Sequence, residues 1–156
     1  MALKCIETKR IQNPELLANI IYHNFVYLIE FPHLSHNKKA IIDTLKLPNN
    51  LCFLVYEDNN LIAYLVGDFK TLNDQRYVYY ISYFYVMENY RSNGLGGQIM
   101  KLVINKCKNM GISFIVLTCD NHDPRVVKFY KKHGFVLDPV LGLAASKRHQ
   151  VMCLYL

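Results

Sequence analysis

The residues with the clearest capacity for binding chemistry lie between Val86 and Gly97, where Arg91 precedes glycines at positions 94, 96 and 97. This stretch follows an apolar run and leads into an amphipathic pattern with helical spacing. Glycine adopts positive φ angles and lets a ligand approach the backbone, and the first N–H groups of a helix attract negative charge. A strand, a glycine-rich turn and a helix start therefore predict a phosphate-binding site.

Two common nucleotide-binding motifs do not fit this stretch. A Walker A loop ends in Gly-Lys-Ser or Gly-Lys-Thr, but Gly97 is followed by Gln98 and Ile99. The Rossmann pattern, counted from Gly94, places Ile99 where a third glycine or alanine belongs, and the residues near 119 form a new apolar run where an acidic ribose ligand is expected. Both nucleotide-binding classes are therefore disfavoured.

Composition indicates one globular domain over residues 1–156. The chain is 52% hydrophobic and 19% charged, and a chain of this length buries roughly 68 to 70% of its unfolded surface. Its longest apolar stretch, Tyr77 to Met87, is shorter than the 18 or more residues of a membrane helix, and the first residues lack the apolar core of a signal peptide. We expect a soluble, cytoplasmic protein.

The net charge of +6 is concentrated around the glycine-rich turn. Residues 89–133 contain eight Lys or Arg residues and two Asp residues, so the rest of the chain sums to zero. Such a field attracts a polyanion, and coenzyme A and nucleic acid both qualify. The alternative is that these side chains form the solvated faces of two helices.

Cysteine and histidine residues give weaker signals. The five cysteines are odd in number and scattered through apolar patterns, which favours buried, reduced thiols. A catalytic cysteine is the alternative, although no histidine is placed beside one. His33 and His36 could contact a substrate or lie on the surface, and without a further ligand cluster they do not predict a metal site.

The elements that would position the turn are strands and helices in alternation. Apolar runs predict strands at residues 3–7, 51–57, 61–69, 77–87, 113–119, 135–137 and 151–156. Helical spacing between caps and Gly or Pro stops predicts helices at residues 14–31, 38–47, 95–110 and 124–133. The strand at 77–87 is expected to be covered on both faces, and residues 138–150 are expected to form a loop. This order predicts a mixed α/β domain.

A second motif gives the first a family context. Residues 128–135 read Lys-Phe-Tyr-Lys-Lys-His-Gly-Phe, with Tyr130 four residues before Gly134. Together with Arg91-x-x-Gly94-x-Gly96 after a strand, this pattern resembles motifs A and B of the GNAT superfamily, the acetyl-CoA-dependent N-acetyltransferases. The resemblance extends to the order of elements over essentially the whole chain. It implies a GNAT fold of the α/β (α+β) class, with a mixed, mostly antiparallel sheet of about six to seven strands and about four flanking helices.

The resemblance also implies roles for individual residues. Val86 and Met87, on a strand that splays from its neighbour, would hold the pantetheine arm and polarise the thioester carbonyl. Tyr130 would lie near the thioester sulfur and protonate the departing thiolate, which is mildly uphill for pKa values of about 10 and 8.5; otherwise it is a core aromatic residue. The turn would bind the pyrophosphate through Arg91, Ser92, Asn93, Gly94, Leu95, Gly96 and Gly97.

Two features depart from the family pattern. Many relatives have Asn seven residues before the motif B tyrosine, where its side chain helps to bind pantetheine; this chain has Asp123 there, with Asn121 two residues earlier. Many relatives also place a Glu general base on the fourth strand, but residues 77–87 contain no carboxylate. A water chain through Tyr80 or Tyr83, or His133, is left as the source of a base.

The resemblance implies an N-acetyltransferase that moves acetyl from acetyl-CoA to a primary amine by direct attack in a ternary complex, without a metal. Because no general base is evident, such an enzyme is expected to favour an amine of low pKa, either a peptide N-terminus or an amino sugar, over lysine or a polyamine. The loop with Ser146-Lys147-Arg148-His149 could shape the acceptor site. Membrane and nucleic acid partners are disfavoured, and a homodimer is left open. The alternatives are a non-catalytic acyl-CoA-binding GNAT-fold module and a basic RNA-binding domain.

Overall fold

The computed structural model describes residues 3–156, without the side chains of residues 144–146. Its strands are β1 (Leu3–Thr8), β2 (Asn50–Glu57), β3 (Asn60–Thr71), β4 (Tyr77–Val86), β5 (Phe114–Asp120), β6 (Val136–Leu137), β7 (Leu143–Ser146) and β8 (His149–Tyr155). Its helices are α1 (Pro14–Asn24), α2 (Lys38–Leu45), α3 (Leu95–Asn109) and α4 (Pro124–Lys132), with short 3-10 helices η1 (Val26–Glu30), η2 (Pro32–Leu34) and η3 (Glu88–Asn93).

The described strands form one sheet of eight strands in the order β1-β2-β3-β4-β5-β8-β6, with β7 also paired to β8. All neighbours are antiparallel except β4 and β5, which are parallel. The predicted mixed, mostly antiparallel sheet is therefore confirmed. The sheet has one strand more than expected, because β7 forms inside the segment predicted to be a loop. The last long strand, β8, also begins earlier than predicted, at His149 instead of Val151.

The parallel pair β4 and β5 separates along its length. Pairing joins Tyr79–Ile81 to Ile115–Leu117, whereas β4 continues to Val86 and β5 to Asp120. Over these last residues, the described strands have no ladder between them. The prediction that the 77–87 strand is covered on both faces is consequently wrong for its second half, since every residue from 82 to 86 is partly exposed.

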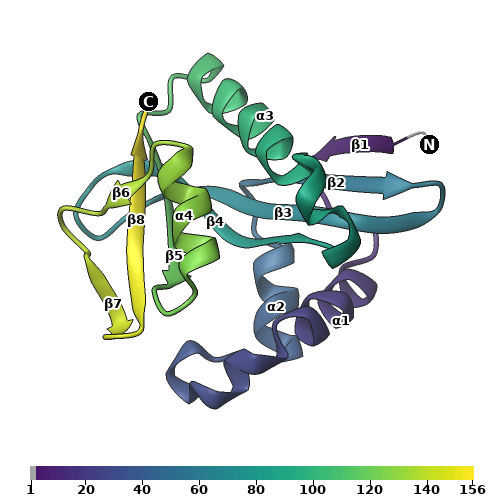
Figure 1. The fold of residues 1–156 in the computed structure, drawn as a ribbon, viewed down its shortest axis with the longest axis horizontal. Coiled ribbons are helices and arrows are strands. Elements are labelled where there is room, and N and C mark those ends of the chain that lie inside the picture. The colour runs from purple at the N-terminus through teal and green to yellow at the C-terminus, as the bar shows by residue number, and fades with distance from the viewer. Residues whose placement is uncertain (1–2) are drawn as a thin grey trace.

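Helices cover the two faces of the sheet and meet separate apolar cores. On one face, α3 contributes Ile99, Met100 and Val103, and α4 contributes Tyr130. On the other face, α1 and α2 contribute Leu17, Ile21, Ile41 and Leu45. In Figure 1 the sheet runs between α3 above and the α1–α2 pair below. None of the helices in residues 3–156 is long and apolar enough to span a membrane.

Side-chain caps set the starts of three helices. The Asn13 side chain accepts a hydrogen bond from the Leu16 N–H, and Pro14 occupies the first turn of α1. Asn37 and Asp123 cap α2 and α4 in the same way. The predicted end of the first helix is wrong, because α1 ends at Asn24 and the chain continues as η1 and η2. Phe25, between α1 and η1, packs its ring on Tyr83 and Tyr85 of β4, which places this segment beside the separated strands.

Candidate active site

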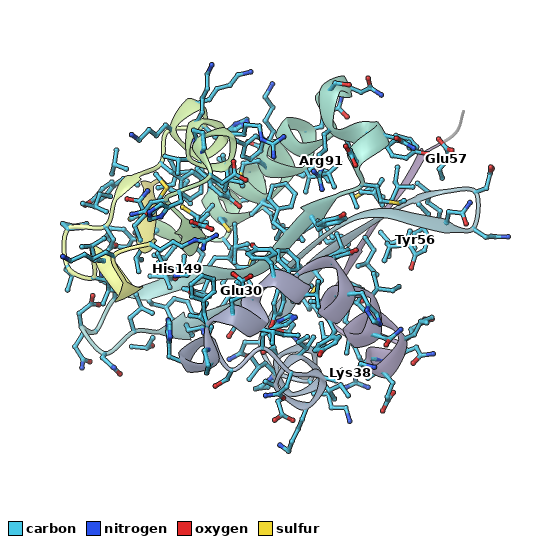
Figure 2. All side chains as sticks on the ribbon, turned by 60° about the horizontal axis from the view of Figure 1, so that its bottom comes forward. Glu30, Lys38, Tyr56, Glu57, Arg91 and His149 are labelled. Atoms are coloured by element: carbon cyan, nitrogen blue, oxygen red, sulfur yellow. The ribbon has the colours of Figure 1, made fainter. Side chains whose placement is uncertain are left out.

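A cleft of about 1820 Å³ passes through the opening between β4 and β5. Its lining includes Gly94 at the start of α3, Tyr130 on α4 and Tyr27 on η1. These elements lie on both faces of the sheet, so the opening joins the two sides of the molecule. We call the part beside Gly94 the turn end and the part beside η1 the flap end. In Figure 2, Arg91 at the turn end is well separated from His149 at the flap end.

The glycine-rich turn has the backbone geometry that the sequence predicts. Gly94 is left-handed, with φ 77° and ψ 7°, and no side chain caps α3. The first N–H groups of this 15-residue helix therefore lack intrahelical and side-chain partners. A Cβ on Gly96 would lie 3.3 Å from a Phe129 ring carbon, and one on Gly97 would lie 3.4 Å from the His133 ring. Glycine thus keeps a narrow approach to these N–H groups open.

Arg91 braces the strand that leads into the turn. Its Nε donates to the Val86 carbonyl oxygen at 2.7 Å, and its guanidinium lies 5.2 Å from the centre of the Tyr85 ring. Arg91 also lines the cleft. A fixed cation beside the helix start adds to the attraction for a phosphate group.

The register of β4 decides which backbone groups face the cleft. The Met87 N–H donates to the Ile62 carbonyl oxygen at 2.8 Å, and β3 is in register with β4 from Ala63 and Val86 onwards. Because alternate residues of an antiparallel strand direct their backbone groups to the partner, Phe84 and Val86 direct theirs toward β5. The Met87 N–H, which the sequence analysis expected to be free, is therefore bonded to β3. The backbone groups of Phe84 face the cleft instead.

The other predicted binding residues divide into two groups. The cleft lining includes Val86, Arg91, Ser92, Gly94, Gly96, Gly97, Asp123 and Tyr130. Four predicted residues do not line it: Met87, Asn93, Leu95 and Asn121. Leu95 packs into the core, and the Asn121 side chain donates to the Lys147 carbonyl oxygen at 2.8 Å. Asn121 therefore holds the turn before β8 and is turned away from the cleft.

Tyr130 lies at the centre of the cleft. It is 8% exposed, packed edge-on against Phe129 and Phe135. Burial, with smaller contributions from Cys119 and Tyr27, raises the pKa of Tyr130 well above its usual value. Its hydroxyl therefore stays protonated throughout the neutral range. Tyr130 is therefore a core aromatic residue that also lines the cleft, and its role as a proton donor stays a prediction.

The cysteines do not offer an activated nucleophile among the described residues. Cys119 lines the cleft beside Tyr130, but burial raises the pKa of its thiol to about 11, the opposite of what activation requires. Three other cysteines, Cys52, Cys107 and Cys153, are buried as predicted. Cys5 is exposed, which corrects the expectation that all five would be buried.

The flap end is held together by contacts between distant segments. Asp120 accepts from Arg148 Nε at 2.9 Å through one oxygen and from the His122 N–H at 2.9 Å through the other. The Arg148 guanidinium lies 4.8 Å from the centre of the Phe31 ring, and the His149 ring stands edge-on to Phe31 at 4.9 Å. Single-sequence reasoning missed Asp120, and no local motif marks it.

The three suggested sources of a base lie in different places. His133 packs on Phe129 at 4.7 Å and beside Gly97, at the turn end, where it could not reach an acceptor that enters from η1. The Tyr80 hydroxyl is 2.8 Å from Thr118 Oγ1 in the cleft, and Tyr83 is bonded to the Thr44 side chain. All three line the cleft, and Tyr80 is hydrogen-bonded there to Thr118, which lines it as well.

Charge is distributed unevenly along the cleft. Arg91, Lys101 and Lys132 line the turn end without a carboxylate beside them in the lining. Elsewhere the described lining contains two cations that are each paired, Arg125 with Asp123 and Arg148 with Asp120. The described residues contain no cluster of three or more His, Cys, Asp or Glu side chains that could hold a metal ion. The turn end is therefore suited to a phosphorylated ligand.

Comparisons with known proteins agree with this geometry. Residues 17–135 match the family model described as "Acetyltransferase (GNAT) family". An uncharacterized N-acetyltransferase, ycf52, from Gracilaria tenuistipitata var. liui is 31% identical over 86 residues, which are 55% of this chain and 45% of that relative. The match thus spans less than half of that protein.

Two solved structures share the fold at low sequence identity. The PaiA N-acetyltransferase from Thermoplasma acidophilum, in complex with coenzyme A, has a TM-score of 0.71 and 15% identity, with all of both chains covered. Naa50 from Arabidopsis thaliana, in complex with the bisubstrate analogue CoA-Ac-MVNAL, has a TM-score of 0.68 and 17% identity, with 98% of each chain covered. These likenesses establish the fold.

Proposed function

The chain belongs to the GNAT acetyltransferase family, and we propose that it transfers the acetyl group of acetyl-CoA to a primary amine by direct attack in a ternary complex. One observation carries the proposal: a single cleft connects the Gly94 turn, Tyr130 and the far face of the sheet through the β4–β5 opening. A donor held on the α3 side and an acceptor entering beside η1 would meet in that opening.

The chain's own groups would hold the donor. The unpartnered N–H groups at the start of α3, with Arg91 nearby, would bind the pyrophosphate. The N–H and carbonyl groups of Phe84 and the N–H of Val86, directed into the opening, would bind the pantetheine arm and face the thioester carbonyl, while the Val86 carbonyl oxygen is taken by Arg91. Such fixed donors stabilise the negative charge that develops on the carbonyl oxygen.

The reaction needs one bond formed and one broken. The amine nitrogen attacks the thioester carbon, and the carbon–sulfur bond breaks as the thiolate leaves with its electron pair. Tyr130 would donate to the sulfur as that charge develops. Because its pKa is raised, full proton transfer is costlier than for an ordinary tyrosine, so hydrogen bonding carries more of the stabilisation. The proton lost by the amine would leave along the Tyr80 and Thr118 side of the opening.

A low-pKa amine is the favoured acceptor. At pH 7.4, deprotonating a lysine side chain costs about 4 kcal/mol, and deprotonating a peptide α-amine costs less than about 1 kcal/mol. No carboxylate lies on β4 to supply that difference. The Naa50 structure contains a bisubstrate analogue with a peptide portion, which supports a peptide N-terminus; an amino sugar remains the alternative within this class.

The test separates binding from turnover. Acetyl-CoA at about 100 times its Kd should stabilise the protein by about 2.7 kcal/mol, a rise in Tm of roughly 5 to 11 °C. Tyr130→Phe should keep this shift and lose about 100-fold in kcat, whereas Tyr155→Phe, at an exposed position, should match the parent.

Three outcomes would count against the proposal. Equal turnover by Tyr130→Phe and the parent would remove the role of the hydroxyl. A thermal shift without acetylation of any amine would favour a non-catalytic acyl-CoA-binding module. Stabilisation by a short RNA with steep salt dependence, and none by acetyl-CoA, would favour an RNA-binding domain.

A further inference from the structure

The flap end of the cleft is covered by a segment that exposes apolar side chains. Helix η1 reads Val-Tyr-Leu-Ile-Glu and contains no buried residue. Val26 is 48%, Tyr27 45% and Ile29 49% exposed. Exposed apolar side chains gathered beside a cleft indicate contact with a ligand. Tyr27 and Leu28 line the cleft, and Val26 and Ile29 do not, so the segment has a cleft side and an outer side.

Aromatic contacts fix both ends of this segment to the sheet. The Phe25 ring lies 5.7 Å from the ring of Tyr83 and 5.9 Å from that of Tyr85 on β4. Six residues later, Phe31 packs on Arg148 and His149 at the start of β8. Tyr27 and Leu28 therefore lie between two anchors, over the opening. Leu34 from η2 lines the same wall.

The two carboxylates that line the cleft near this wall are already engaged. Both oxygens of Asp120 accept hydrogen bonds, from Arg148 and the His122 N–H. Asp123 accepts from the Arg125 N–H at the start of α4, and its side chain is 3.6 Å from Arg125 Nε. These are the acidic side chains of the described cleft lining. Within the described lining, a second ammonium group on the acceptor would consequently find no carboxylate that is not already paired; Glu30, the last residue of η1, lies outside that lining.

Building on the proposed acetyl transfer, we propose that the acceptor is the α-amine of a peptide whose first residue has a large apolar side chain. That side chain packs against Tyr27, Leu28 and Leu34, and the amine attached to the adjacent carbon reaches the β4–β5 opening. A polyamine or a lysine-first peptide brings a second positive charge that the site does not neutralise. An amino sugar brings hydroxyl groups to a wall that presents mainly carbon, and leaves them without partners.

The experiment compares matched acceptors. Heptapeptides that differ only in their first residue, Met, Leu or Phe against Ser, Gly or Lys, are assayed with acetyl-CoA beside glucosamine and spermidine. We expect kcat/KM to be at least about tenfold higher for the apolar-first peptides. Leu28→Ala should reduce that preference several-fold. Ile29→Ala, on the outer side of the same helix, should leave it unchanged.

Controls keep the two proposals separable. Circular dichroism and the thermal shift with acetyl-CoA establish that each variant is folded; if Leu28→Ala is not, Leu34→Ala takes its place. Turnover that is indifferent to the first residue, an equal effect of Leu28→Ala and Ile29→Ala, or faster acetylation of glucosamine or spermidine overturns this inference and leaves acetyl transfer standing. A thermal shift without acetylation of any acceptor overturns the proposed function, and this inference with it.

Discussion

The two ends of the cleft are built in different ways. At the turn end, residues 91–97 supply a left-handed glycine, an uncapped helix start and a cation from one short stretch of chain. At the flap end, Phe31, Asp120 and Arg148 come from three separate segments and are joined by an ion pair and a cation–π contact. The geometry of the turn end is therefore determined by one short stretch of sequence, whereas the geometry of the flap end depends on the whole fold.

This contrast has a functional counterpart. The turn end presents backbone N–H groups and positive side chains, which suit the invariant phosphates of a common donor. The flap end presents side chains on an irregular segment, which can change without disturbing the sheet. A family that keeps its donor and varies its acceptor would place each function at the end of the cleft where we propose it for this chain.

The largest expected effect comes from removing the ion pair behind the flap end. Arg76 Nη1 and Nη2 bond the two oxygens of Asp138 at 2.8 and 3.0 Å, and the Asp138 side chain is fully buried. Asp138→Ala removes both of these charge-assisted bonds, although Asp74 still pairs with Arg76, so the free energy of unfolding should fall by about 3 to 5 kcal/mol. Calorimetry should register a Tm lower by roughly 6 to 20 °C.

A matched control removes a carboxylate from an exposed pair. Lys39 and Asp43 are 3.0 Å apart with side chains 86% and 63% exposed, so Asp43→Ala should change stability by less than about 1 kcal/mol. Asp138 also accepts the N–H groups of Val140 and Leu141, in the segment that leads to β8. If the folded Asp138→Ala protein kept parental acceptor kinetics, the flap end would not depend on that support.

How far the sequence predicted the site follows the same division. The glycine-rich turn and Tyr130 were found because each motif is contiguous and its spacing has a physical reason. At the flap end the sequence suggested the loop with Arg148 and His149 but not its contacts, because sequence cannot tell that Phe31 meets Arg148 across more than one hundred residues. Helical spacing even predicted a helix over residues 14–31, whereas α1 ends at Asn24 and the anchoring of Phe25 on β4 accompanies a tighter 3-10 turn.

The register between β3 and β4 could not be predicted from the sequence either. The end of β4 was placed within one residue, but the choice between Phe84 and Met87 depends on which N–H groups β3 takes. The sheet itself was predictable, since its apolar runs are long and their separators clear. The short strand β7 was missed, because four residues within a loop carry no reliable pattern.

A smaller effect should follow from changing charge at the turn end. Lys101 lines the cleft, so Lys101→Gln should weaken acetyl-CoA binding about 5- to 10-fold at low salt and less at high salt, as screening predicts. Lys106 on the same helix instead pairs with Glu7 at 3.0 Å. Isothermal titration of Lys106→Gln should give the parental Kd; equal losses in both variants would mean that only net charge matters.

The smallest expected effect is a pH dependence confined to the turn end. Burial, with Lys132 and Lys101 nearby, lowers the pKa of His133 below its usual value, so it is neutral at pH 7 and gains a proton only as the pH falls below about 6.5. That proton places a positive charge beside Gly97 and should tighten binding of dephospho-CoA a few-fold between pH 7.5 and 5.5. His133→Gln should bind with a flatter profile, to which only the other histidines of the lining, His36, His122 and His149, contribute. His23→Gln, outside the cleft lining, should follow the parent. Dephospho-CoA is the appropriate ligand because its pyrophosphate does not titrate in this range, so the pH dependence of binding belongs to the protein.

The lowered pKa of His133 also affects stability without ligand. As the pH falls, the unfolded chain takes up this proton before the folded protein does, so stability should decline over that interval, and less in His133→Gln. Opposite signs for binding and stability distinguish a histidine next to the phosphates from one that merely packs on Phe129; a His133→Gln protein with the parental binding slope would place the phosphates elsewhere in the cleft.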